Sequence, residues 1–308
     1  MLLAQAQHVL VGSPETIIFF GHGIGDDLLC TAVGHELKKR GIRKIVIFSR
    51  YKELFSGNPD FHNVWNIGDK SVARRKYSGL PCIIPFYGGY DAASDRDLMG
   101  ATHIIEVMCR AAGIRGEIEL RPYIHLTASE KARGRLFRKQ AVIQSCGLRT
   151  AAGVMKNKEW YPERFQQVVD DLQGEINFVQ LGNVEDPPLQ GVIDLRGKTT
   201  LRESASILAN SMFFAGQVGF LMHLARAVDC RSAIVYGGRE DPRVTGYRCN
   251  MNLTGSMPCA PCWQRNRCDY DKECMRQITA DAVTAACRSL MRNACYPLDR
   301  ECTVIEGS

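Results

Sequence analysis

Short apolar runs alternate with longer amphipathic segments along most of the chain. The short runs are rich in β-branched and aromatic residues and end at glycines or polar residues, which predicts buried strands. The predicted strands cover residues 16–20, 44–48, 81–85, 141–144, 176–181, 212–215 and 233–236. The predicted helices cover residues 26–40, 102–112, 129–139, 201–209 and 221–228, and a further helix begins near Pro162. Strands that alternate with helices indicate βαβ units, and therefore parallel sheets in an α/β fold.

The alternation occurs twice, and residues 113–126, rich in Gly, Arg and Pro, separate the two sets. We therefore predict two Rossmann-like domains that face a central cleft. The N-terminal domain covers residues 1–127. The C-terminal domain covers 128–308 and includes a Cys-rich segment, 249–274, and a C-terminal helix. A length of 308 residues agrees with two domains of about 150 residues each. In such sheets ligands bind beyond the carboxyl ends of the strands.

Composition and charge narrow the class of protein. Hydrophobic residues make up 45% and charged residues 23% of the chain, which is typical of globular domains and excludes a disordered protein. No run approaches the roughly 18 apolar residues of a membrane span, and the N-terminus lacks the basic region of a signal peptide. We therefore expect a cytoplasmic protein. A net charge of +6 permits weak attraction to anionic surfaces but does not require nucleic acid, which we do not expect as a partner.

Cysteine is abundant near the C-terminus. Eight of the thirteen cysteines fall between Cys249 and Cys302. Four of them have the spacing Cys259-x2-Cys262-x5-Cys268-x5-Cys274. Four thiolates so spaced can form a tetrahedral structural site for Zn or Fe. Reduced thiols, or one or two disulfides, are the alternatives.

A glycine-rich turn follows the first predicted strand. Gly23 and Gly25 precede Asp26 and Asp27 at the start of the predicted helix. As a dinucleotide-binding fingerprint the turn is defective, because Asp26 stands where the third glycine should be. A carboxylate here could instead accept a proton from an acceptor hydroxyl as a general base. The alternative is that Asp26 or Asp27 only caps the helix.

Two further turns follow strands of the second set. The loop that contains Ser145 and Gly147 and leads to Lys158 has small residues, a cation and a helix start, which together can hold a diphosphate. A solvated loop with ordinary lysines is the alternative. Gly219, Met222 and His223 follow another strand. His223 could contact a ligand phosphate or sugar, or it could be a packed core histidine.

Four segments, in this order and spacing, resemble glycosyltransferase family 9, the ADP-heptose:lipopolysaccharide heptosyltransferases and their relatives. They are residues 23–31 (GIGDDLLCT), 158–165 (KEWYPERF), 194–201 (DLRGKTTL) and 222–228 (MHLARAV). The resemblance covers nearly the whole chain. It implies a GT-B fold, with the acceptor on the N-terminal domain and a nucleotide sugar on the C-terminal domain. It also implies inverting transfer without a catalytic metal.

The resemblance assigns roles to individual residues. Asp26 matches the catalytic base of the family, and Lys158 matches a lysine that neutralises the donor diphosphate. Glu185 falls roughly where an acid meets the nucleoside ribose. The family commonly has Asp-Ser/Thr-Gly where this chain has Val218-Gly219-Phe220, which predicts a different contact to the donor sugar. The Cys-rich segment is similar to the iron-binding segment of autotransporter heptosyltransferases.

The sequence thus predicts an inverting glycosyltransferase. It would transfer a heptose or hexose from a nucleoside-diphosphate donor, ADP-heptose or a related sugar, to a hydroxyl of a cell-surface glycan such as lipopolysaccharide. A glycan or glycolipid acceptor would be held at the inner membrane face, where anionic lipids attract basic proteins. The alternative is a non-catalytic nucleotide- or nucleic-acid-binding relative with a metal-stabilised Cys finger. A nicotinamide oxidoreductase is a third hypothesis.

Overall fold

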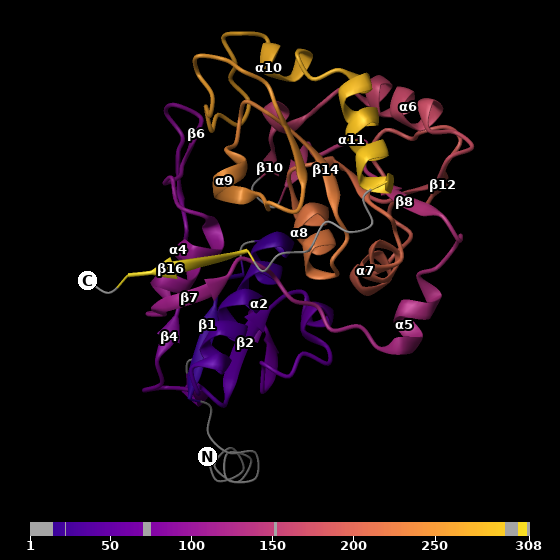
Figure 1. The fold of residues 1–308 in the computed structure, drawn as a ribbon. Coiled ribbons are helices and arrows are strands. Elements are labelled where there is room, and N and C mark those ends of the chain that lie inside the picture. Colours follow the sequence, from indigo (N-terminus) through magenta and orange to yellow (C-terminus); the bar gives the residue numbers. More distant parts are fainter. Residues whose placement is uncertain (1–14, 22, 70–74, 151–152, 293–300, 307–308) are drawn as a thin grey trace. The chain divides into compact units, whose positions relative to one another are not determined.

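The structure is a computed structural model that describes residues 15–21, 23–69, 75–150, 153–292 and 301–306. The chain divides into two compact units. Unit 1 contains residues 1–87, 105–125 and 302–308, and unit 2 contains residues 88–104 and 126–301. Each is an α/β unit with its own parallel sheet (Figure 1). No helix in the described part of the chain has the length and apolar character that a membrane span needs.

Unit 1 is built on a four-stranded sheet of order β3-β2-β1-β4, in which all neighbours are parallel. Its strands are β1 (Thr16–Phe19), β2 (Ile45–Ser49), β3 (Asn63–Asn66) and β4 (Cys82–Ile83). Helix α2 (Ile24–Lys39) connects β1 to β2. Acidic residues in its first turn and lysines in its last turn agree with the direction of the helix dipole. The apolar side of α2, including Leu28 and Val33, is fully buried.

The rest of unit 1 comes from distant parts of the sequence. After the short 3₁₀ turns η1 (Lys52–Phe55) and η2 (Ile67–Asp69), the chain returns as helix α4 (Ile104–Ala111) and strand β7 (Gly116–Glu119). Strand β16 (Cys302–Ile305) pairs antiparallel with β7. The buried Glu36 carboxylate joins α2 to β7, because it accepts from the backbone N–H of Glu119 and from Arg40.

Unit 2 is built on a six-stranded parallel sheet of order β12-β11-β8-β13-β14-β15. Its strands are β8 (Gln140–Ile143), β11 (Asn177–Gln180), β12 (Ile193–Asp194), β13 (Phe214–Gln217), β14 (Ser232–Gly237) and β15 (Met251–Thr254). This is the Rossmann strand order, whose topological switch point lies between the first and fourth strands, here β8 and β13. The loops after these two strands are therefore where a ligand is expected.

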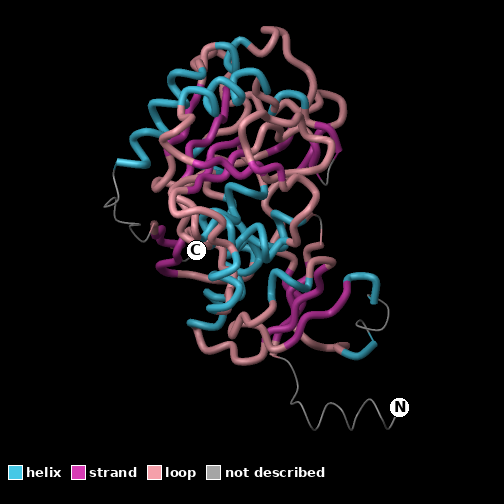
Figure 2. Tube along the Cα trace, turned by 90° about the vertical axis from the view of Figure 1, so that its right-hand side faces the viewer, coloured by secondary structure: helices cyan, strands magenta, loops and turns pink. Residues whose placement is uncertain are grey.

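Helices cover both faces of the unit 2 sheet (Figure 2). Helices α6 (Pro162–Asp171) and α11 (Ala280–Arg292) pack against each other, with α11 also against β14, and α7 (Leu201–Ala209) packs against α8 (Phe220–Ala227). The indole of Trp160 is buried, and its N–H donates to the carbonyl of Ile278 at 3.1 Å. The ring meets Phe165 edge-on, with 4.7 Å between ring centroids. This contact fixes the segment just after Lys158 to the core.

Unit 2 also contains several smaller elements. They are the hairpin β5 (Gly89–Asp91) and β6 (Arg96–Leu98), helix α5 (Ala128–Arg133), strands β9 (Arg149–Thr150) and β10 (Gly153–Val154), the turn η3 (Lys156–Lys158), and helices α9 (Pro242–Thr245) and α10 (Glu273–Arg276). The hairpin pairs with residues 263–265. Asp97 N–H donates to Trp263 O, Arg265 N–H donates to Asp95 O, and Arg96 bridges Gln264.

Several details differ from the sequence predictions. The division places residues 88–104 in unit 2 and 302–308 in unit 1, whereas the predicted domains were continuous. The helix predicted over 129–139 ends at Arg133, because the side-chain oxygen of Gln140 accepts from the backbone N–H groups of Leu136 and Phe137. The strand predicted over 212–215 lies at 214–217, and residues 113–126 contain β7.

Candidate functional site

Asp26 lies in the first turn of α2, at the carboxyl end of β1. Its Oδ1 accepts a hydrogen bond from the Tyr87 hydroxyl at 2.5 Å, and the Tyr87 ring packs against Phe20 with 5.8 Å between centroids. Gly23 occupies the N-cap position with extended backbone, and no side chain caps the helix. The Tyr87 hydroxyl therefore fixes one oxygen of the Asp26 carboxylate.

Asp27 has a different environment from its neighbour. Its side chain is buried, and it accepts a hydrogen bond from Ser49 at the end of β2. Burial raises the pKa of Asp27 to about 6, and the nearby Asp26 charge adds to the effect, although the Ser49 hydrogen bond opposes it. Asp27 therefore links α2 to β2, while Gly25 lies in the same helical turn as Asp26.

Gly147 and Gly219 flank the switch point of the unit 2 sheet. A Cβ at Gly147 would come within 3.0 Å of the Gln217 side-chain oxygen. Gln217, at the end of β13, donates from its side-chain amide to the carbonyl of Lys158 at 2.6 Å. Gly219 caps α8 in extended conformation, and nothing lies within 4 Å of the position its Cβ would take. The structure thus brings the Gly147 loop, the Gly219 turn and Lys158 to one edge of the sheet.

Lys158 ends the short turn η3 and forms an ion pair with Glu240. The distance between Lys158 Nζ and Glu240 Oε1 is 2.8 Å. Glu240 is buried in the loop after β14 and also pairs with the buried Arg239. Burial alone would raise the pKa of Glu240, but the charges of Lys158 and Arg239 lower it to about 2. The ammonium group of Lys158 therefore sits beside a permanent carboxylate.

Three predicted donor-binding residues have other contacts. The Ser145 hydroxyl is fully buried and donates to Pro187 O at 2.6 Å. Met222 is fully buried, and its sulfur accepts from the Tyr236 hydroxyl at 3.3 Å. The carboxylate of Glu185 is exposed and pairs with Arg149 at 2.6 Å. Ser145 thus connects two loops, Met222 packs helix α8 against strand β14, and Glu185 lies at the surface.

His223 is a buried, neutral histidine. Its Nδ1 lies 2.7 Å from the hydroxyl oxygen of Tyr247, and the two rings meet edge-on. Burial, with a smaller contribution from His103, lowers the pKa of His223 to about 3. It therefore carries no charge at neutral pH. The contacts of His223 with Tyr247 are those of a histidine packed in the core of unit 2.

The four predicted metal ligands, Cys259, Cys262, Cys268 and Cys274, line one cavity of about 430 Å³ in unit 2. Backbone N–H groups approach three of the sulfurs, including Lys272 N–H to Cys268 Sγ at 3.2 Å. However, no group of three or more His, Cys, Asp or Glu side chains in the described ranges could hold a metal ion as arranged. Each of the twelve cysteines that the structure describes is a free thiol. The thiols are near one another but are not assembled as a ligand set.

Sequence reasoning missed the charged residues around Lys158. Arg239 and Glu240 follow β14 and the Gly237-Gly238 pair, at the same carboxyl edge as the other turns. Their position after a predicted strand could have indicated them, because ligands bind beyond the carboxyl ends of the strands in such sheets. Asp97, which also contacts Arg239, has no such signal, since it reaches the site from a hairpin about 140 residues earlier in the sequence.

No protein-family model matches the sequence, and none of the curated protein sequences compared with it matches. Several solved structures match. A glycosyl transferase of family 9 from Veillonella parvula has a TM-score of 0.67 at 13% identity, covering 92% of this chain and 98% of that chain. E. coli ADP-heptose lipopolysaccharide heptosyltransferase II has a TM-score of 0.67 at 13% identity, covering 90% and 99%.

A third match is TibC from enterotoxigenic E. coli, an iron-containing dodecameric glycosyltransferase. Its TM-score is 0.71 at 15% identity, covering 91% of this chain and 77% of that chain. TibC has also been solved in complex with ADP-D-β-D-heptose. These proteins share with the present chain two α/β units with parallel sheets. The chain therefore has the GT-B fold of the family 9 glycosyltransferases, as the resemblance in its sequence predicted.

Proposed function

We propose that the protein is a family 9 glycosyltransferase that transfers a sugar from a nucleoside diphosphate to an acceptor hydroxyl, with inversion and without a catalytic metal. The observation that carries the proposal is the placement of Lys158. Its backbone carbonyl accepts from Gln217 at the end of β13, and its ammonium pairs with Glu240 just after β14, both at the carboxyl edge of a Rossmann-order sheet. The structures that share the fold are glycosyltransferases, and TibC binds ADP-D-β-D-heptose.

The residues present suit an inverting displacement. Asp26 would take the proton of the acceptor hydroxyl as the oxygen attacks the anomeric carbon. The new glycosidic C–O bond forms as the bond from the anomeric carbon to the diphosphate oxygen breaks, and the electron pair leaves with the diphosphate. Lys158 would stabilise the charge that develops on the departing group. The loss of the Asp-Ser/Thr-Gly pattern at residues 218–220 favours a donor sugar contacted differently from that of typical relatives.

We further propose a glycan or glycolipid acceptor on unit 1 and action in the cytoplasm at the inner membrane face. The net charge of +6 supports this, because basic proteins are attracted to anionic lipid surfaces.

The first experiment is thermal unfolding of the purified protein with ADP, UDP, GDP, CDP and NADH side by side. A ligand that binds only the folded state, at about 100 times its Kd, adds roughly 2.7 kcal/mol of stability. We expect a clear shift with one nucleoside diphosphate. A shift with NADH alone would favour an oxidoreductase. The absence of a shift, together with steeply salt-dependent binding to RNA or DNA, would favour the non-catalytic alternative.

Metal binding at the four finger cysteines is a separate proposal. Four thiols that line one cavity, with backbone N–H groups directed at sulfur, support it. In the arrangement described here they do not yet form a ligand set, so binding would require their side chains to turn toward one another. We expect about one Zn or Fe per chain in reductively purified protein, measured by elemental analysis. A folded protein without metal would contradict this proposal.

A further inference from the structure

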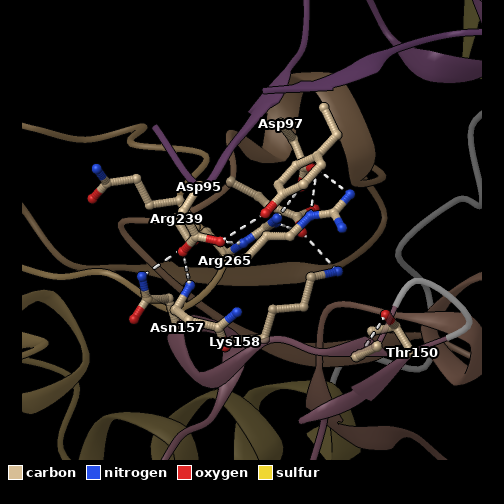
Figure 3. A network of polar contacts seen from close by, with 12 residues as sticks. Asp95, Asp97, Thr150, Asn157, Lys158, Arg239 and Arg265 are labelled. Atoms are coloured by element: carbon tan, nitrogen blue, oxygen red, sulfur yellow. Dashed lines mark hydrogen bonds and ion pairs between the residues drawn. The ribbon is translucent and has the colours of Figure 1, made fainter. Parts of the chain in front are cut away.

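Beside Lys158 the structure contains a chain of alternating charges (Figure 3). Lys158 pairs with Glu240, Glu240 with Arg239, Arg239 with Asp97, and Asp97 with Arg265. All five side chains are largely buried, the most exposed being Arg265 at 16%. The guanidinium of Arg265 ends the chain by stacking on Tyr90, 3.7 Å from the ring centroid. Neither the sequence motifs nor the proposed reaction accounts for this arrangement.

The Cys-rich segment, residues 249–274, supports this chain of charges at several points. It contains Arg265, and the carbonyl of Gln264 accepts from Arg239 Nε at 3.0 Å. It also supports the turn that carries Lys158. Asn157 N–H donates to Arg265 O at 3.0 Å, and the Asn157 side chain donates to the carbonyls of Gln264 and Arg267. The turn that carries Lys158 is therefore held to this segment through Asn157. The ion-pair partner of Lys158, Glu240, is connected to the segment only through Arg239.

The charges explain why Glu240 matters to Lys158. A lysine side chain has four flexible bonds, and holding its ammonium in one place costs conformational entropy. Glu240 holds it through a charge-assisted hydrogen bond at 2.8 Å, and two further N–H donors of the ammonium remain for a ligand. The Glu240 carboxylate also pairs with Arg239, so its negative charge is balanced by two cations. Without this carboxylate, Lys158 would lose its ion-pair partner beside the buried Arg239, which would keep only Asp97.

We propose that Glu240 is the positioning residue of Lys158, and that the Cys-rich segment serves the donor site by holding Glu240, Arg239 and the Lys158 turn in place. The inference rests on the proposed function, since it takes the diphosphate of the donor as the group that Lys158 meets. It gives the Cys-rich segment a role in donor binding whether or not the segment holds a metal.

The test is a double-mutant cycle read out by ligand affinity. The Kd of the nucleoside diphosphate that stabilises the wild type, among ADP, UDP, GDP and CDP, is measured for wild type, Glu240→Gln, Lys158→Met and the double variant. The Kd of the matching nucleoside without phosphates is measured in parallel. Glu130→Gln is the matched control, because Glu130 forms a comparable ion pair with Arg202 at 2.6 Å elsewhere in unit 2.

We expect Glu240→Gln to weaken diphosphate binding about tenfold, as the loss of one charged hydrogen bond implies, with nucleoside binding unchanged. In the Lys158→Met background the same substitution should have little further effect, and Glu130→Gln should have none. If Glu240→Gln does not fold, Asp97→Asn replaces it in the cycle, with the same sign and a smaller effect.

The outcomes separate the two proposals. If the wild type binds none of the four diphosphates, the proposed function fails and this inference fails with it. If the wild type binds one, but Glu240→Gln weakens nucleoside and diphosphate equally, or acts equally with and without Lys158, only the inference is overturned. If Glu240→Gln weakens the binding of the diphosphate but not of the nucleoside, and does so only when Lys158 is present, both proposals are supported.

Discussion

The carboxyl edges of the two sheets carry buried acids whose pKa values are shifted in opposite directions. Both sheets follow the order third, second, first, fourth around their first strand. In unit 1 the buried Asp27 has the Ser49 hydroxyl as its side-chain hydrogen-bond partner, and its pKa rises to about 6. In unit 2 Glu240, which is also buried, contacts Lys158 and Arg239, and its pKa falls to about 2.

The comparison shows that burial alone does not set the charge of an acid; its partners decide. Hydroxyl partners leave a carboxyl group able to exchange a proton near neutral pH, which suits the edge that holds the proposed base. Cationic partners keep a carboxylate permanently charged, which suits the support of a lysine. The same strand order thus places a carboxyl group with a raised pKa at the edge of one sheet and one with a lowered pKa at the edge of the other.

The largest expected effect is on the unit 1 edge. Asp26→Asn removes the proposed base, so sugar transfer should fall about 1,000-fold, within the range of general base catalysis. Nucleoside diphosphate affinity should be unchanged, because the proposed donor site is in unit 2. Turnover is measured as diphosphate release from the sugar nucleotide identified by the binding screen. Near wild-type turnover would remove Asp26 from the mechanism.

The second-largest expected effect is a loss of stability when the buried acid at the edge of the unit 2 sheet is replaced. Glu240→Gln leaves Arg239 and Lys158 without their shared carboxylate, and the free energy of unfolding at pH 7 should fall by about 3 kcal/mol. The control is Glu175→Gln, which breaks an ion pair with Arg288 whose side chains are 46% and 38% exposed. Exposed pairs contribute little, so its loss should be under about 1 kcal/mol. Urea unfolding measures both, and equal losses would contradict the role of burial.

The third prediction is a pH dependence for Asp27. Its pKa is about 6 in the folded protein, against an ordinary value of 3.8 for an aspartate, so the folded state holds the proton more tightly than the unfolded chain does. Ionisation therefore lowers stability as pH rises from about 4 to above 6. Asp27→Asn should raise the free energy of unfolding at pH 7.5 by at most about 3 kcal/mol, with little change at pH 4. A gain in the free energy of unfolding that is equal at pH 4 and pH 7.5 would contradict the raised pKa of Asp27.

The smallest effect concerns Tyr87. Tyr87→Phe removes the hydroxyl that donates to Asp26 at 2.5 Å but keeps the ring that packs on Phe20. Transfer should slow about tenfold, the cost of one charged hydrogen bond, and diphosphate binding should not change. The same turnover assay detects this, with Tyr123→Phe, a tyrosine in unit 1 that donates to Glu119, as the matched control. A loss as large as that of Asp26→Asn would indicate that Tyr87 itself takes part in proton transfer.

Much of the fold could be predicted from local patterns. The apolar runs that predicted strands correspond to β1, β2, β4, β8, β11, β13 and β14. Most of these strands are buried on both faces, so their β-branched and aromatic residues lie next to each other in the sequence. The short edge strands β7, β12 and β16 were missed because two to four residues of mixed polarity carry no periodic signal.

The candidate site was predictable only in part, because local sequence patterns do not record which way a side chain turns. Asp26 and Lys158 follow apolar strands and match motifs, so sequence alone indicated them. Ser145 and His223 had similar positions, but their side chains turn to Pro187 and Tyr247. Whether a side chain at the edge of a sheet meets a ligand or packs inward depends on its rotamer and its neighbours. No spacing rule records that choice.

The sequence by itself determined the α/β class, the two βαβ sets, the turns that follow their strands and the family resemblance, because all of these rest on local periodicity and short motifs. Tertiary structure decided which charges meet. Asp97, Lys158 and the adjacent pair Arg239 and Glu240 come from three separate segments, and only folding brings them within contact. Electrostatic energies depend on distance and burial, neither of which is written in the order of the residues.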